Sequence, residues 1–408
     1  MSMCSTARRA APVAIAVIVG ALSALPGYAQ APADAADTRA ATIVAQQTAK
    51  ATRLAPYEPG AIEALVKEVS EHLTASEVKW HPYYDTAYNG AGFTLGAGYV
   101  FHPGDFDTLD MSAAMSFTKS KRAEVEYRLP GILGRRGVLT VLGGWREGLG
   151  ESFFGIGPAT SATGRTAFDF RQSAVSSTID LRPNRRAVVL MGGVELQHYE
   201  QRPVTGSDFE QSYTPETLPG FGATTDYVQV HGTAAIDWRP AEDYARRGGY
   251  YGVTARRYDD TSGPFSFRRV DYEVVQHVPV LRDAWVLSLR GRVETTYTSE
   301  GDTVPFFILP TLGSGSTLRG FASMRFRDRN SLLLSAEWRV LVNGFVDVAL
   351  FYDAGKVAER RADLDFKQLN KDYGVGFRVH TFAATPIRVD FARSTEGFQV
   401  AFAASAVF

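Results

Sequence analysis

The residue best suited to a specific charged contact is Arg319, which stands in an unusual stretch at residues 311–326. This stretch reads Thr-Leu-Gly-Ser-Gly-Ser-Thr-Leu-Arg-Gly-Phe-Ala-Ser-Met-Arg-Phe. Its glycines and hydroxyl residues exclude a regular strand or a stable helix. In a solvated linker, however, the apolar side chains of Leu318, Phe321 and Phe326 would be exposed to water. We therefore expect a loop with buried anchors, whose guanidinium can bind carboxylates through charge-assisted, bidentate hydrogen bonds.

Two carboxylates that follow this loop are placed to face an interior. Alternation along residues 345–353 puts Asp353 on one face of a strand and Leu350 and Tyr352 on the other. The same alternation puts Glu337 on the inward face of the preceding strand. The alternative is that the loop arginine is solvated and these carboxylates merely line a wet interior.

The segments around the loop alternate between apolar and polar residues from about residue 90 to residue 408. In residues 122–129, for example, Arg and Glu alternate with Ala, Val, Tyr and Leu. In a periplasmic sandwich or propeller the apolar face would meet another sheet, whereas in a membrane barrel it meets lipid while the charged face lines water. Repeated charge on one face favours the barrel, with about eleven strands before the loop and five after it, about sixteen in all.

The beginning of the chain predicts export. Residues 1–29 read as a signal peptide, with Arg8 and Arg9 before an apolar core at residues 13–25 and a small-residue cleavage site. Residues 30–85 read as a leader.

Within the leader, residues 61–74 carry one apolar stripe and predict a short amphipathic helix. This helix either rests on the periplasmic rim or enters the barrel as a plug. The barrel is expected to occupy residues 86–408.

Composition excludes several other classes. With 43 basic and 44 acidic residues the chain has no nucleic-acid footprint, and its single cysteine, Cys4, precedes the apolar core of the signal peptide. Neither His231 nor His277 lies in a catalytic motif, and no Gly-x-Ser-x-Gly, His-Glu-x-x-His or phosphate-binding loop is present. We therefore expect no enzyme, no cofactor and no metal site, although a barrel hydrolase remains an alternative.

The loop motif Leu318-Arg319-Gly320-Phe321 resembles the conserved extracellular loop of the outer-membrane protein assembly superfamily, the BamA/TamA-type bacterial surface antigens. In that family the arginine tucks into the barrel lumen. The run from Phe351 to Gly355, with Asp353 at its centre, matches the family's Phe-x-Asp-x-Gly strand motif, which receives the arginine. The resemblance implies that Arg319 binds Asp353, with Glu337 as a second inward carboxylate, and that the contact locks the loop inside.

Other segments resemble the same family. The final strand places Phe398, Phe402 and Phe408 in phase on the outward face and resembles the C-terminal signal by which barrels are recognised for insertion. Residues 199–226 read as a long external loop, and residues 237–250 resemble the family's Arg-rich periplasmic turn. Residues 30–85 are too short and too poor in strands for even one of the family's periplasmic POTRA modules.

These observations predict an all-β transmembrane antiparallel barrel of about sixteen strands, with a short N-terminal helix, in the bacterial outer membrane. The resemblance implies a role in inserting or translocating protein or lipid, and the alternative is a passive pore with an inherited fold. Expected partners are outer-membrane lipid, the barrel assembly machinery that inserts this chain, and unfolded outer-membrane proteins or lipid as cargo.

Overall fold

The computed structural model describes residues 79–86, 92–183, 187–204, 207–281, 284–381, 384–403 and 405–408, together with residues 43, 45, 46 and 48. The predicted signal peptide at residues 1–29 and the predicted helix at residues 61–74 lie outside the described residues. The first strand begins at Trp80, before the predicted barrel boundary at residue 86. No helix in the described part is long and apolar enough to cross a membrane.

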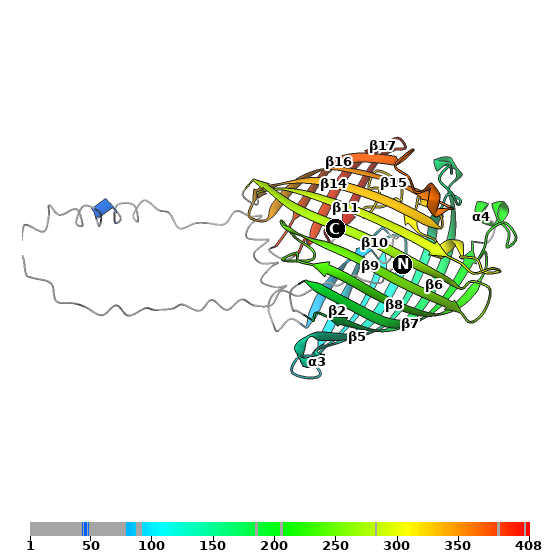
Figure 1. Cartoon of the computed structure of the whole chain (residues 1–408), viewed down its shortest axis with the longest axis horizontal. Helices are drawn as coiled ribbons and strands as arrows, with labels where there is room; N and C mark the ends of the chain where they lie inside the picture. The colour runs from blue at the N-terminus through cyan, green and yellow to red at the C-terminus, as the bar shows by residue number, and fades with distance from the viewer. Residues whose placement is uncertain are drawn as a thin grey trace, which may run out of the picture. The chain divides into compact units, whose positions relative to one another are not determined.

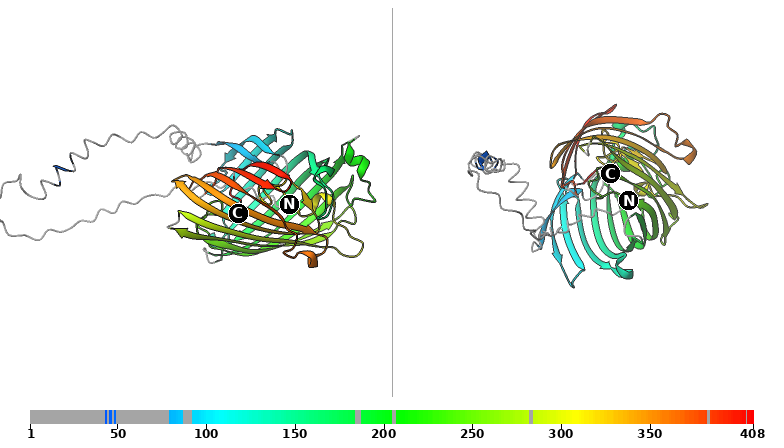
Figure 2. Two further views of the ribbon diagram at one scale, coloured as in Figure 1. Left: turned by 90° about the horizontal axis from the view of Figure 1, so that it is seen from above. Right: turned by 60° about the vertical axis from the view of Figure 1, so that its left-hand side comes forward.

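The described residues form one antiparallel sheet of sixteen strands, in which each strand pairs with the next along the chain (Figure 1). The strands are β1 (Trp80–Thr86), β2 (Phe93–Phe101), β3 (Thr108–Ser116), β4 (Lys121–Gly131), β5 (Gly137–Phe153), β6 (Thr166–Leu181), β7 (Val188–Pro203), β8 (Thr224–Asp237), β9 (Gly248–Asp260), β10 (Phe267–Leu281), β11 (Trp285–Tyr297), β14 (Asn330–Asn343), β15 (Val346–Ala358), β16 (Asn370–Val379), β17 (Ile387–Ser394) and β18 (Gly397–Ala403). The sheet curls into a barrel, as the right-hand view of Figure 2 shows. The predicted strand number and their division around the central loop are confirmed.

Smaller elements lie in the connections. They are the two-stranded sheet of β12 (Thr311–Leu312) and β13 (Phe326–Arg327), the short helices α3 (Ile132–Arg135) and α4 (Asp208–Ser212), and the 3-10 turns η1 (Ala162–Gly164), η2 (Phe306–Ile308) and η3 (Arg361–Asp363).

The outer face of the sheet is apolar, and most of its charged residues lie on the inner face. In β15, Leu350 and Tyr352 are exposed on the outside, whereas Asp347, Phe351 and Asp353 are buried inside. This alternation follows from the two-residue period of a strand. It places apolar side chains against lipid and charged side chains in the lumen, the interior of the barrel.

Outward aromatic pairs mark the border of the apolar band at the end with the shorter turns. The ring centroids are 5.0 Å apart in Trp80–Tyr99, 4.9 Å in Trp238–Tyr251 and 5.9 Å in Trp285–Trp338.

The opposite end carries the long connections, at residues 154–165, 204–223, 298–329 and 359–369. Because short turns face the periplasm and long loops face outward in bacterial barrels, these connections are assigned to the outside. The loop predicted at residues 199–226 is shorter than expected, because β7 continues to Pro203 and β8 starts at Thr224. Its polar flanks belong to strands that rise above the apolar band.

Candidate functional site

Arg319 lies inside the barrel with its side chain fully buried between two strands. Its Nε and Nη2 donate to the two carboxylate oxygens of Asp353 on β15 at 2.6 and 3.0 Å. Its Nη1 donates to Oε2 of Glu337 on β14 at 2.9 Å. The guanidinium carbon lies 3.4 Å from the ring centroid of Phe351. The planar group is thus held on its edges by carboxylates and on one face by an aromatic ring.

This arrangement keeps Arg319 charged although its side chain is buried from solvent. Burial by itself lowers the pKa of a guanidinium, but the charges of Asp353 and Glu337 outweigh burial and raise the pKa of Arg319 above its ordinary value. The guanidinium therefore keeps its charge, and the contact positions the loop.

The ion pairs continue beyond the residues that the sequence analysis singled out. Arg378 on β16 donates to Glu337 at 2.7 Å and to Asp390 on β17 at 3.2 Å, and Arg388 lies 3.1 Å from Asp390. These charges could have been found from alternation along β16 and β17, which turns them inward. Their convergence on one site could not, because it depends on how the sheet curves.

Two glycines let the backbones approach closely at this site. A Cβ at Gly320 would lie 2.6 Å from Cβ of Asp372 and 3.1 Å from Cβ of Ser394, and the Ser394 hydroxyl donates to the Gly320 carbonyl at 2.7 Å. A Cβ at Gly355 would lie 2.8 Å from the Leu332 carbonyl oxygen. Glycine is therefore required at both positions by space alone.

Apolar side chains hold the loop beside the charges. Leu318 and Phe321 are buried in one cluster, whose members are Leu312, Leu318, Phe321, Phe326, Leu333 and Val357. The rings of Phe321 and Phe326 meet edge to face at 5.2 Å. The predicted anchors are thus brought together with Arg319, and all eight predicted residues of the loop site lie within this region.

A second arginine ties the same loop to external connections. Arg325 donates to the Glu396 carboxylate at 2.9 Å, in the β17–β18 turn, and to the Thr160 hydroxyl at 2.8 Å, in the β5–β6 loop. The loop therefore spans from the last strands to the opposite wall.

That opposite wall carries a large aromatic cluster. It is formed by inward residues of β5–β10 and by residues of two external loops, namely Phe153, Phe168, Phe170, Tyr199, Phe209, Leu218, Tyr227, Tyr258, Phe267, Val304, Phe306, Phe307, Ile308 and Leu309. Arg327 donates to the Phe306 carbonyl at 2.7 Å and lies 5.5 Å from the centroid of the Phe153 ring. Burial in this cluster lowers the pKa of Arg327 to about 10.

The predicted periplasmic turn at residues 237–250 also reaches across the barrel. Tyr244 donates to Asp347 at 2.7 Å and stacks on His380 with ring centroids 4.0 Å apart. The Thr385 hydroxyl donates to the Asp243 carbonyl at 3.1 Å. A turn between β8 and β9 thus contacts β15 and the β16–β17 turn on the far side.

The predicted C-terminal signal is only partly on the outer face. Phe398 and Phe402 are exposed there, but β18 ends at Ala403, so the prediction that Phe408 continues in phase is wrong. Phe408 instead stacks on His277 at 6.2 Å and lies 5.9 Å from the Arg290 guanidinium, which donates to the Val407 carbonyl at 3.3 Å. Attraction between a cation and an aromatic ring favours this inward position.

His277 and Ser288 form a pair that no sequence motif predicted, with Nδ1 and Oγ 2.8 Å apart. Arg339 donates to the Ser288 hydroxyl at 3.1 Å, and both members of the pair are buried. A nucleophile needs access to its substrate, so this geometry favours a structural role for the pair.

Comparisons with known proteins agree with this fold. Residues 207–400 match the Omp85 superfamily domain. The structure is similar to that of BamA from Haemophilus ducreyi lacking POTRA domains 1–3, with a TM-score of 0.61 and 15% identity over 80% of this chain and 69% of that chain. It is also similar to CdiB from Escherichia coli, with a TM-score of 0.54 and 14% identity over 81% of this chain and 63% of that chain. No curated protein matches the sequence.

Proposed function

We propose that this chain, a member of the Omp85 superfamily of outer-membrane barrels, assists the insertion or translocation of protein or lipid at the outer membrane. The proposal rests mainly on the observation that a loop and an aromatic cluster fill much of the lumen. The loop at residues 313–325 is anchored through Arg319 on the inner face of the last strands, while the aromatic cluster fills the opposite wall. A passive pore needs an open water path along the lumen, and these buried contacts stand in it.

The edges of the sheet support the same proposal. Strands β1 and β18 are the two ends of the strand order, and within the described part of the chain each has 7 residues, against 17 in β5. A tilted transmembrane strand needs about 9–11 residues, so the bilayer beside β1 and β18 is expected to be thinner than average. Edge strands also present backbone N–H and C=O groups that can pair with an incoming strand.

The role of Arg319 in this proposal is to hold the loop as a fixed inner wall. We propose that Leu318, Arg319, Gly320 and Phe321 form a lock with their partners on β14 and β15, namely Glu337, Phe351, Asp353 and Gly355. A loop fixed by a buried, bidentate ion pair stays in place while the edges of the sheet move.

Two measurements, one on a deletion strain and one on the purified protein, test the proposal. The first is the protein and lipid composition of the outer membrane after deletion of the gene, and the second is the conductance of the purified barrel in planar bilayers. Insertion or translocation predicts an altered composition and small or unstable conductance. Large, stable channels together with an unchanged composition would instead establish the passive pore.

A further inference from the structure

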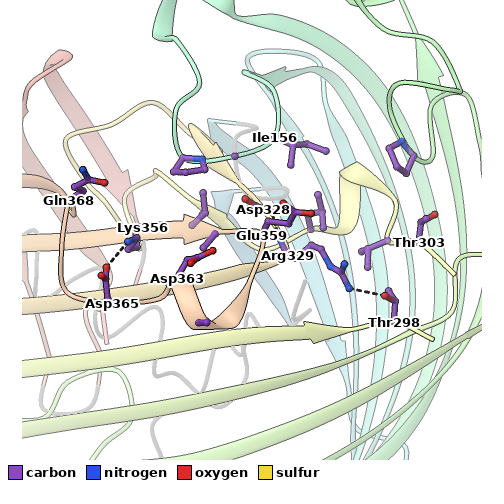
Figure 3. Close-up of a pocket in the computed structure, with 18 of the residues that line it drawn as sticks. Ile156, Thr298, Thr303, Asp328, Arg329, Lys356, Glu359, Asp363, Asp365 and Gln368 are labelled. Carbon is purple, nitrogen blue, oxygen red and sulfur yellow. Dashed lines mark hydrogen bonds and ion pairs between the residues drawn. The ribbon is translucent and has the colours of Figure 1, made fainter. Parts of the chain in front are cut away.

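The external face contains a cavity that the loop lock does not use. It has a volume of about 930 Å³ and is lined by the β5–β6 loop, Pro219 of the β7–β8 loop, the 298–309 segment, Asp328 and Arg329 after β13, and the end of β15 with the β15–β16 connection (Figure 3). A cavity of this size can hold a small-molecule ligand or one side chain of a peptide together with the adjoining backbone. Its walls are in part apolar, through Pro158, Pro219, Val304, Leu309 and Val357.

The floor of the cavity carries a buried carboxylate. Asp328 is 2% exposed, and its Oδ1 accepts a hydrogen bond of 2.7 Å from the backbone N–H of Arg329. The Arg329 guanidinium, which also lies on the cavity wall, donates to the Thr298 hydroxyl at 2.7 Å, as Figure 3 shows. Within the described residues no ion pair is found for Asp328, and the charge of the neighbouring Arg329 acts on it only as a lesser influence, so the cavity holds a buried carboxylate that no cation contacts directly.

Other carboxylates add to this charge. Asp302 and Glu359 also line the cavity, and Glu359 lies near Asp328 in Figure 3. Burial raises the pKa of Asp328, and repulsion by Glu359 contributes in the same direction. The hydrogen bond from the Arg329 backbone N–H and the charge of Arg329 act in the opposite direction but do not outweigh burial.

The cations of the cavity wall do not supply that charge. Lys356 donates to Asp365 at 2.8 Å and to the Lys367 carbonyl at 3.2 Å, so its ammonium is bound to groups other than Asp328. A metal ion is a poorer fit, because no group of three or more His, Cys, Asp or Glu side chains in the described part of the chain is arranged to bind one. An apolar wall beside a single buried carboxylate suits an ammonium or guanidinium on an aliphatic stem.

We propose that this external cavity binds an organic cation, with Asp328 as the buried counter-charge, Glu359 and Asp302 as supporting carboxylates, and the proline and valine side chains packing on the aliphatic stem. Two sources share this chemistry, a free polyamine and a lysine side chain of a polypeptide outside the cell. The proposal stands on the cavity alone and does not depend on the function proposed for the barrel.

The test is isothermal titration calorimetry on the full chain in detergent micelles. The probes are spermidine, the peptide acetyl-Gly-Lys-Gly-amide, its norleucine analogue and magnesium chloride. The proposal expects saturable binding of spermidine or the lysine peptide, and no binding of the norleucine peptide. Stronger binding of spermidine identifies a polyamine site, whereas stronger binding of the lysine peptide identifies a polypeptide ligand.

Three variants make the test specific. Asp328→Asn keeps the shape of the side chain and removes its charge, so affinity should fall at least about tenfold. Ala362→Trp, at an exposed position of the cavity wall, should block binding without changing the buried charges. Glu300→Gln, on the same loop as Asp302 but outside the cavity lining, is the matched control and should bind as the wild type does.

Failure of both amines to bind at millimolar concentration would overturn the proposal. So would equal affinity of wild type and the Asp328→Asn and Ala362→Trp variants. If magnesium displaces the amine with comparable affinity, the site is a metal site and the organic cation is rejected. Heat-modifiable gel mobility verifies folding of each variant, and Ala362→Trp keeps the test decisive if Asp328→Asn fails to fold.

Discussion

Replacement of Arg319 by alanine is expected to have an effect that depends on which carboxylate loses its partner. Glu337 keeps Arg378 at 2.7 Å after the change, whereas within the described residues Asp353 has no ion pair other than the one with Arg319. The variant therefore leaves one buried carboxylate without a counter-charge. Breaking a buried pair from one side typically costs about 3–5 kcal/mol, and we expect a loss of unfolding free energy in that range.

Second substitutions identify the origin of that loss. In the Arg319→Ala background, Asp353→Asn removes the stranded charge and should recover about 1–3 kcal/mol. Glu337→Gln in the same background should recover nothing, because Glu337 still pairs with Arg378 there and is not left without a counter-charge. Arg319→Lys should rescue only in part, because an ammonium cannot bind both oxygens of Asp353 and also Glu337 in the planar geometry of a guanidinium.

The assay is guanidinium unfolding in detergent micelles, followed by tryptophan fluorescence and by the mobility of unboiled protein on gels. Protease sensitivity of residues 313–325 reports the loop directly and should rise in Arg319→Ala. The double-mutant cycle of Arg319→Ala with Asp353→Asn should be less than additive. Strictly additive losses, or equal protease sensitivity in wild type and Arg319→Ala, would refute the reasoning that this ion pair anchors the loop.

Three further predictions concern packing inside the barrel. Gly320→Ala places a Cβ 2.6 Å from that of Asp372 and should lower the unfolding free energy by about 1–3 kcal/mol, whereas Gly344→Ala, which meets nothing within 4 Å, should leave it unchanged. Phe306→Ala should cost about 3–5 kcal/mol in the same unfolding assay and raise single-channel conductance. Phe366→Ala, at a side chain that is 75% exposed, is its control, and equal conductance in the two variants would contradict the proposal that the aromatic cluster stands in the water path. Phe408→Ala removes the contacts with Arg290 and His277 and should lower the unfolding free energy by about 0.5–2 kcal/mol, whereas an unchanged unfolding midpoint would show that the inward contact contributes no stability.

The sequence by itself determined the strands and the face that each residue occupies. A two-residue period with apolar residues on one side and charges on the other is a local property, so Asp353 and Glu337 could be assigned to the interior from alternation alone. The glycines and apolar anchors around Arg319 likewise identified a loop with buried contacts before any distance was known.

Tertiary structure decided which of these charges meet. Arg378, Arg388 and Asp390 converge on the same site because the sheet curves, and curvature is a sum over many strands that no local pattern reports. The inward position of Phe408 was missed for a related reason. Alternation predicts the outer face only while the chain stays in the strand, and the attraction of Arg290 and His277 becomes available only once β10 and β11 stand across the lumen from the C-terminus.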